Sequence, residues 1–164
     1  PRRVRNFAVA AGLVGAALAG GSVASDPKDR WYQRLDKPSW QPPPAAFPIA
    51  WTALYTSIAV TSTAVLNELD RRGDRAGATE YERALARNLA LNGTWSWLFF
   101  RSHQLGASTL GAGALAASSI GLARRAGRVR PRYGLALAPY ALWTSFATVL
   151  AATVWRRNPG RTGA

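Results

Sequence analysis

The chain has 164 residues, a mass of 17.6 kDa and a formal net charge of +13, from 21 Lys and Arg residues against 8 Asp and Glu residues. It has no cysteine, which excludes disulfides, thiol nucleophiles and cysteine-ligated metals. Its single histidine, His103, excludes a multi-histidine metal site, so no bound metal is expected. These averages alone suggest a small, basic, soluble protein of the kind that binds nucleic acid.

The positions of the charges contradict that first interpretation. Long stretches carry no charged residue at all: 6–25, 38–67, 88–100, 102–123 and 133–155. A helix needs about 20 apolar residues to cross a hydrocarbon core of roughly 30 Å. The sequence therefore predicts an all-α integral membrane protein, a bundle of five transmembrane helices in a single domain over 1–164. Its arginines lie between the spans, where they meet lipid headgroups, so no nucleic-acid partner is expected.

The first predicted span, 7–25, has an alternative interpretation as a signal peptide, because Arg2, Arg3 and Arg5 precede its apolar stretch. The four later spans favour a membrane helix. A loop over 26–46 follows, and its prolines forbid a regular helix. Its large aromatic residues fit either an interfacial belt or a structured lid over a pocket, and the proline-fixed shape favours the lid.

Four further spans are predicted at 47–66, 84–100, 104–123 and 133–155. The segment 67–83 is interpreted as an aqueous loop, and 123–132 as a strongly basic turn. With five spans, one side of the membrane carries 13 of the 21 basic residues. The positive-inside rule then predicts a cytoplasmic N-terminus.

Polar and aromatic side chains inside the spans mark the candidate site. Asn92 needs a partner in the membrane, either a neighbouring helix or a ligand. No Asp or Glu lies inside a span, which argues against a proton-coupled or cation-coupled transporter. Trp51 and Tyr55 share a helix face, as do Trp95 and Phe99. The aromatic set predicts either a structural core or a cavity for a large, flat, apolar ligand.

Three segments resemble the TspO/MBR family, the tryptophan-rich sensory proteins also called translocator protein or peripheral benzodiazepine receptor. They are WYQRLDKPSWQPPPAAFPIAWTALY at 31–55, ALNGTWSWLFF at 90–100 and PYALWTSFATVLAATVW at 139–155. The resemblance covers essentially the whole chain, in order. It implies a five-helix bundle, a homodimer, and a ligand cavity closed by the first loop.

The resemblance also implies a function: a membrane receptor or sensor that binds porphyrins, such as protoporphyrin IX and haem-related tetrapyrroles, with a regulatory or stress role. The porphyrin would be a ligand, with no covalently bound cofactor, and the location would be a bacterial cell membrane. Two alternatives stay open, namely light- and oxygen-dependent porphyrin degradation and tetrapyrrole transport. Trp51 and Trp143 are the photochemical candidates, and the sequence offers no other catalytic constellation.

The residues that the resemblance assigns to ligand binding fall into a lid and a set of cavity walls. The lid residues are Trp31, Tyr32, Trp40, Pro42 and Pro43, and the wall residues are Trp51, Tyr55, Asn92, Trp95, Phe99, Trp143, Phe146, Ala147 and Leu150. The chain departs from the family at Leu150-Ala151, where Leu-Asn is common. Ligand selectivity at that point is therefore open, and sterol binding is not carried over.

Overall fold

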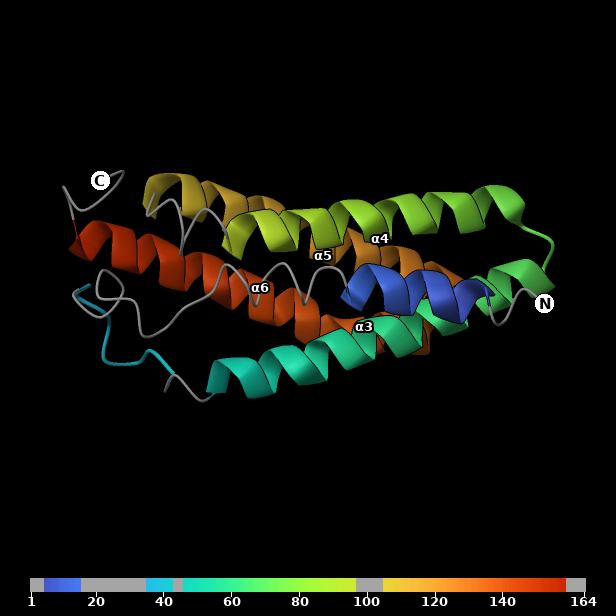
Figure 1. Ribbon diagram of the computed structural model, residues 1–164, viewed down its shortest axis with the longest axis horizontal. Coiled ribbons are helices and arrows are strands. Elements are labelled where there is room, and N and C mark those ends of the chain that lie inside the picture. The colour runs from blue at the N-terminus through green and yellow to red at the C-terminus, as the bar shows by residue number, and fades with distance from the viewer. Residues whose placement is uncertain (1–4, 16–34, 43–45, 97–104, 159–164) are drawn as a thin grey trace.

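The computed structural model describes residues 5–15, 35–42, 46–96 and 105–158. Four long helices follow one another in this part of the chain. They are α3 (Ala46–Arg71), α4 (Arg75–Ser96), α5 (Leu105–Val129) and α6 (Pro131–Arg157). Residues 5–15 form a further helical segment. The helices run back and forth along one long axis, so that consecutive helices are antiparallel (Figure 1).

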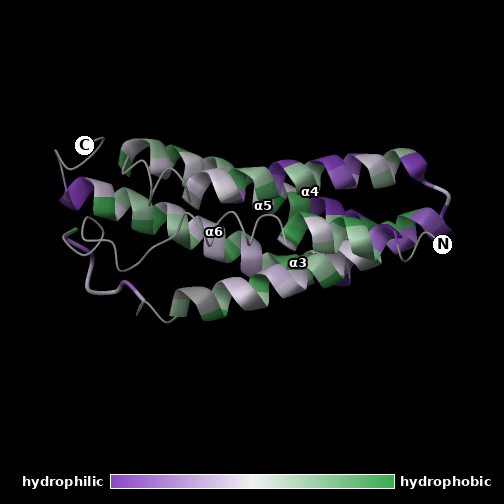
Figure 2. Cartoon of the chain, viewed as in Figure 1, coloured by the Kyte–Doolittle hydropathy of each residue, from purple (hydrophilic) through white to green (hydrophobic). Residues whose placement is uncertain are grey.

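Three of these helices are long and apolar enough to cross a membrane: Ile49–Arg71, Leu105–Val129 and Pro131–Arg157. Their outer surfaces expose large apolar side chains, among them Ile49, Leu110 and Leu135. A soluble protein rarely presents so much apolar surface, whereas a bilayer requires it. Figure 2 shows hydrophilic residues gathered at the turn between α3 and α4, and apolar residues along the middle of the bundle. The expectation of an all-helical, multi-pass integral membrane protein is confirmed.

The turn between α3 and α4 is much shorter than the loop that the sequence predicts over 67–83. Only residues 72–74 separate the two helices. Gly73 adopts a φ of +73°, a left-handed conformation that favours glycine. The Asp74 carboxylate then accepts a hydrogen bond of 2.8 Å from the backbone N–H of Gly77, which caps α4. The alanine, glutamate and arginine residues that follow are good helix formers, so α4 begins before the apolar stretch.

The predicted basic turn at 123–132 is likewise almost entirely helical. Arg130, with an extended backbone at φ −149°, is the one residue between α5 and α6. Pro131 suits the first turn of α6 for two reasons. Its fixed φ is already helical, and the backbone N–H that proline lacks would have no hydrogen-bond acceptor within the helix at this position. The two helices come closest at a glycine pair: a Cβ atom on Gly134 would lie 2.9 Å from Gly127 Cα. This close approach keeps the hairpin narrow.

The segment 5–15 packs against α3 and α4 at the end of the bundle that holds their connecting turn (Figure 1). Asn6 is buried, and its amide nitrogen donates to Asn67 Oδ1 at 2.9 Å and to Asp70 Oδ2 at 2.6 Å. Arg5 pairs with Glu82 at 2.9 Å. These polar contacts fix the segment at one end, and an apolar core that includes Ala10 and Val14 continues from them into the bundle.

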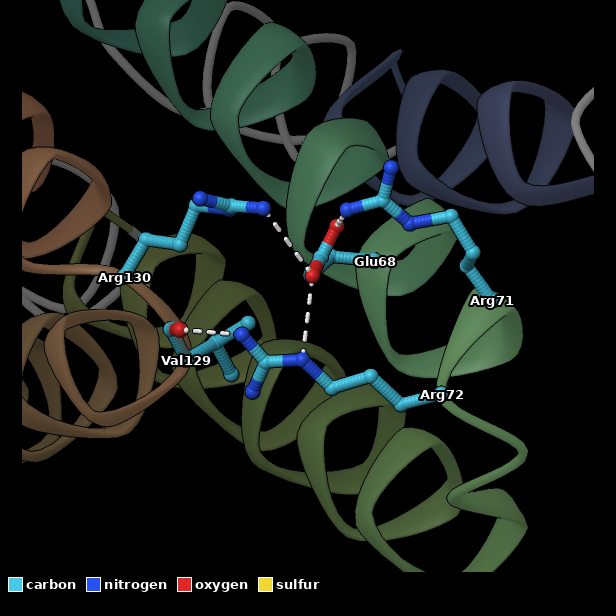
Figure 3. A network of polar contacts seen from close by, with 5 residues as sticks. All are labelled: Glu68, Arg71, Arg72, Val129 and Arg130. Atoms are coloured by element: carbon cyan, nitrogen blue, oxygen red, sulfur yellow. Dashed lines mark hydrogen bonds and ion pairs between the residues drawn. The ribbon is translucent and has the colours of Figure 1, made fainter.

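A second polar cluster joins the two short turns, and it centres on Glu68, whose side chain is 8% exposed. The Glu68 carboxylate accepts hydrogen bonds from Arg72 at 3.0 Å, from Arg130 at 3.2 Å, and from Arg71 (Figure 3). Arg72 also donates to the carbonyl of Val129 at 2.9 Å. One carboxylate therefore holds the end of α3 against the junction of α5 and α6.

The glycine contact gives a first prediction. Gly134→Ala forces its methyl group into the Gly127 backbone, so we expect the variant to lose about 1–3 kcal/mol of stability, as overpacked sites do. Gly113→Ala is the matched control, because its new Cβ would lie 3.8 Å from Thr148, an ordinary contact. Thermal unfolding in detergent micelles, followed by circular dichroism, measures both. Equal melting temperatures for the two variants would contradict the close packing.

The carboxylate cluster gives a second prediction. Glu68→Gln leaves three arginines around a neutral amide, and we expect the variant to unfold more easily than the unmodified protein, with a smaller loss than for a fully buried pair because the arginines are exposed. Glu80→Gln is the control, since its pair with Arg125 at 3.4 Å is exposed and contributes little. Urea unfolding in micelles compares them. A Glu68→Gln protein as stable as the control would show that the cluster does not hold the turns together.

Candidate functional site

An aromatic cluster centred on Trp51 lies between α3 and α6. The Trp51 ring stacks on Tyr55, with ring centroids 5.4 Å apart and an angle of 27° between the planes. It meets Trp143 edge to face at 6.3 Å and Tyr140 edge to face at 6.4 Å. Both arrangements are the favourable ones for aromatic pairs. Two of the predicted wall residues on α3 and one on α6 are thus brought into direct contact.

The cluster extends from the bundle to the loop 35–42. Trp143 contacts Phe146 at 5.7 Å, and Phe146 contacts Trp40 of the loop at 5.8 Å with an angle of 68°. A turn closed by the Gln41 N–H, which donates to Pro38 O at 3.1 Å, presents Trp40. Trp40 keeps 47% of its surface exposed. The predicted lid residue therefore lies at the edge of the aromatic cluster.

A chain of hydrogen bonds crosses the bundle beside the aromatic cluster. Tyr55 donates to Asn92 Oδ1 at 2.5 Å, and Asn92 Nδ2 donates to Tyr140 Oη at 3.4 Å. Tyr140 in turn donates to Asn88 Oδ1 at 2.7 Å, and Asn88 Nδ2 donates to Ser119 Oγ at 3.0 Å. We call these five residues the polar seam. It links one side chain each from α3, α5 and α6 to two from α4.

The hydrogen bonds of the polar seam show whether Asn92 binds a neighbouring helix or is available to a ligand. Both its oxygen and its nitrogen have partners on other helices, so it makes the interhelical bond that was one of the two interpretations. A ligand would have to share these atoms or displace a tyrosine.

Three members of the polar seam, Tyr140, Asn88 and Ser119, are not among the site residues predicted from the sequence. The available signal was the four-residue spacing of Asn88 and Asn92, which places both amides on one face of α4.

Other predicted site residues lie elsewhere or outside the described part. Leu150 packs with Leu35, Leu105 and Val154 in a small apolar cluster at the far end of α6, away from the polar seam. Four of the predicted residues lie outside the described residues, namely Trp31, Tyr32, Pro43 and Phe99. Four others are partly buried, namely Pro42, Trp95, Ala147 and Leu150.

The charge around the site comes from the loop, because the described parts of the predicted spans 47–66, 84–100, 104–123 and 133–155 carry arginine only at Arg87 and no carboxylate. Partial burial lowers the pKa of Lys37, three residues before Trp40. Among the described residues, no group of three or more His, Asp or Glu side chains could hold a metal ion.

A separate groove of about 470 Å³ lies between residues 8–13 and α4, lined mainly by small apolar side chains with Glu82 and Arg83 at its edge. None of the described residues that line it is aromatic, so it is a different kind of surface from the Trp51 cluster.

Comparisons with known proteins agree with the fold. Residues 7–156 match the TspO/MBR family. The chain is 33% identical to Protein CrtK of Rhodobacter capsulatus over 153 residues, covering 90% of this chain and 91% of that protein. It is 35% identical to the human Translocator protein over 138 residues, covering 82% and 78%, and 29% identical to Tryptophan-rich protein TspO of Chlorobaculum tepidum over 160 residues, covering 96% and 99%. The chain therefore belongs to the TspO/MBR family of membrane proteins.

Proposed function

We propose that the protein is a receptor or sensor that binds a porphyrin, such as protoporphyrin IX, against the Trp51 cluster and under the loop 35–42. The observation that carries the proposal is the aromatic chain from Trp40 through Phe146 and Trp143 to Trp51. A large, flat, mostly apolar molecule is best held by aromatic faces together with a few polar groups.

The burial of the aromatic side chains supports this use over a purely structural one. Tyr55 and Tyr140 are almost fully buried, as expected for members of the polar seam. Trp51, Trp143 and Phe146 are only partly buried, and Trp40 is exposed. Aromatic rings that already pack against one another and still keep free surface can accept a further ring by stacking. A sealed structural core would leave no such surface.

The polar seam suits an apolar ligand next to it. Its amides and hydroxyls satisfy one another, so they do not need a ligand to compensate their burial. Recognition would then rest on the shape and the stacking of the ring system, and polar substituents of the ligand would point toward the loop, where Lys37 lies.

This proposal predicts a selective loss of binding. Trp143→Ala removes the ring that joins Trp51 to Phe146, so we expect the dissociation constant for protoporphyrin IX to rise at least about tenfold, as for a central aromatic anchor. Purified protein in lipid nanodiscs is titrated with protoporphyrin IX, and the shift of the porphyrin absorption band reports binding. Absorbance is preferable to tryptophan quenching because the variant itself removes a tryptophan.

Leu142→Ala is the matched control. Leu142 is the preceding residue of α6 and is 70% exposed on the outer surface of the bundle, so its truncation should leave the affinity unchanged. If the two variants bind with the same affinity as the unmodified protein, the porphyrin does not use the Trp51 cluster, and the proposed site is wrong.

A further inference from the structure

The side chain of Asn158 binds the loop 35–42 to the C-terminal end of α6. Its Oδ1 accepts a hydrogen bond of 2.8 Å from the backbone N–H of Asp36, and its Nδ2 donates to the carbonyl of Asp36 at 2.9 Å. The same Nδ2 also donates to the carbonyl of Val154 at 2.8 Å. Only 2% of Asn158 is exposed. The amide therefore pairs with both polar groups of a single loop residue, while it caps α6.

Apolar packing supports the same attachment. Leu35, the neighbour of Asp36, is buried against Leu105 of α5 and Val154 of α6. The ion pair between Arg157 and Asp36 is 3.9 Å long and exposed, and pairs of this kind add little. Among the contacts that the structure describes, one buried amide and one buried leucine make this attachment. We call this pair of contacts the clasp.

The chemistry of the clasp is specific to an amide of this length. It needs an acceptor for the Asp36 N–H and a donor for the Asp36 carbonyl in one planar group. Alanine would leave both backbone groups without these partners in a buried place, which is costly. Glutamine would keep both the acceptor and the donor but carry them on a side chain that is one methylene longer, so it should preserve part of the interaction.

The position of the clasp relates it to the aromatic cluster. Phe146 precedes Asn158 by 12 residues, or about 18 Å along α6, and Trp40 contacts Phe146 from the same loop that contains Asp36. The loop therefore contacts α6 in two places: at Leu35 and Asp36, where the contacts with Val154 and Asn158 are buried, and at Trp40, which is half-exposed. Movement away from the helix should break the Trp40 contact first and turn about the clasp.

We propose that Asn158 is a positioning residue that holds the loop 35–42 over the Trp51 cluster and so sets how long a bound ligand stays. The prediction about how long a ligand stays bound depends on the function proposed above, whereas the prediction that Asn158 holds the loop in position does not. Asn158 does not touch the aromatic rings to which the binding site is assigned; it acts through Asp36 and through the turn that carries Trp40.

The absence of cysteine from the sequence allows a direct test of loop position. Ser39 is exposed beside Trp40, so Ser39→Cys takes a nitroxide spin label without other labelling sites. In nanodiscs, and without ligand, we expect Asn158→Ala to make the label clearly more mobile by electron paramagnetic resonance, and Asn158→Gln to give an intermediate spectrum. Thr153→Ala is the control, because the Thr153 hydroxyl bonds to Val149 O within α6 and not to the loop.

The same variants test the dwell time. We expect Asn158→Ala to release protoporphyrin IX about tenfold faster, the effect of roughly one net hydrogen bond lost, while the association rate changes less. Asn158→Gln should fall between this variant and the unmodified protein, and Thr153→Ala should match the unmodified protein. A merely structural role would lower the melting temperature without this graded effect on release.

The two measurements separate the possible failures. If even the unmodified protein binds no porphyrin, the proposed function fails, and the spin label still decides whether Asn158 positions the loop. If Asn158→Ala is folded by circular dichroism and its label is as immobile as in the unmodified protein, the clasp does not hold the loop. If the label becomes mobile but the release rate is unchanged, the control of dwell time is overturned. Should Asn158→Ala not fold, Asn158→Gln carries both comparisons.

Discussion

The need to satisfy buried polar groups inside a hydrocarbon environment governs this structure. An amide or a hydroxyl in that environment has no water to bond, so it must find a partner in the protein. The polar seam meets this need with side chains from all four long helices, and each of its hydrogen bonds joins two different helices. It therefore specifies which helices are neighbours, and it places the Trp51 cluster beside it.

Much of the fold could be predicted because segments that cross a membrane must be long and uncharged, and such segments are visible in the sequence. The uncharged stretches locate α3, α5 and α6, and the proline-rich stretch before them locates an irregular loop. The ends of the helices were less accessible. Charged residues suggest an aqueous loop, but 75–83 and 124–129 are helical all the same, since aqueous charge and helix formation are compatible. The charge pattern therefore shows which residues meet water more clearly than it shows where each helix ends.

The site was predictable where its contacts are local along the chain. The spacing of four between Trp51 and Tyr55 predicts a shared face, and the two rings stack. The contacts of Trp51 with Trp143, and of Asn92 with Tyr140, join residues far apart in sequence, and no local pattern specifies them. Asn158 is the extreme case: it is separated from Asp36 by 122 positions and looks from the sequence like a polar residue at the end of a helix.

That long separation has a consequence for biosynthesis. The hairpin of α5 and α6 needs only Arg130 to connect its helices, so its contacts are available as soon as both helices are made. The clasp instead joins a loop near the start of the chain to the last described residue, so it cannot close before α6 has left the ribosome. Trp143 and Phe146 lie on the same helix, so the aromatic cluster and the clasp are both completed at the end of synthesis.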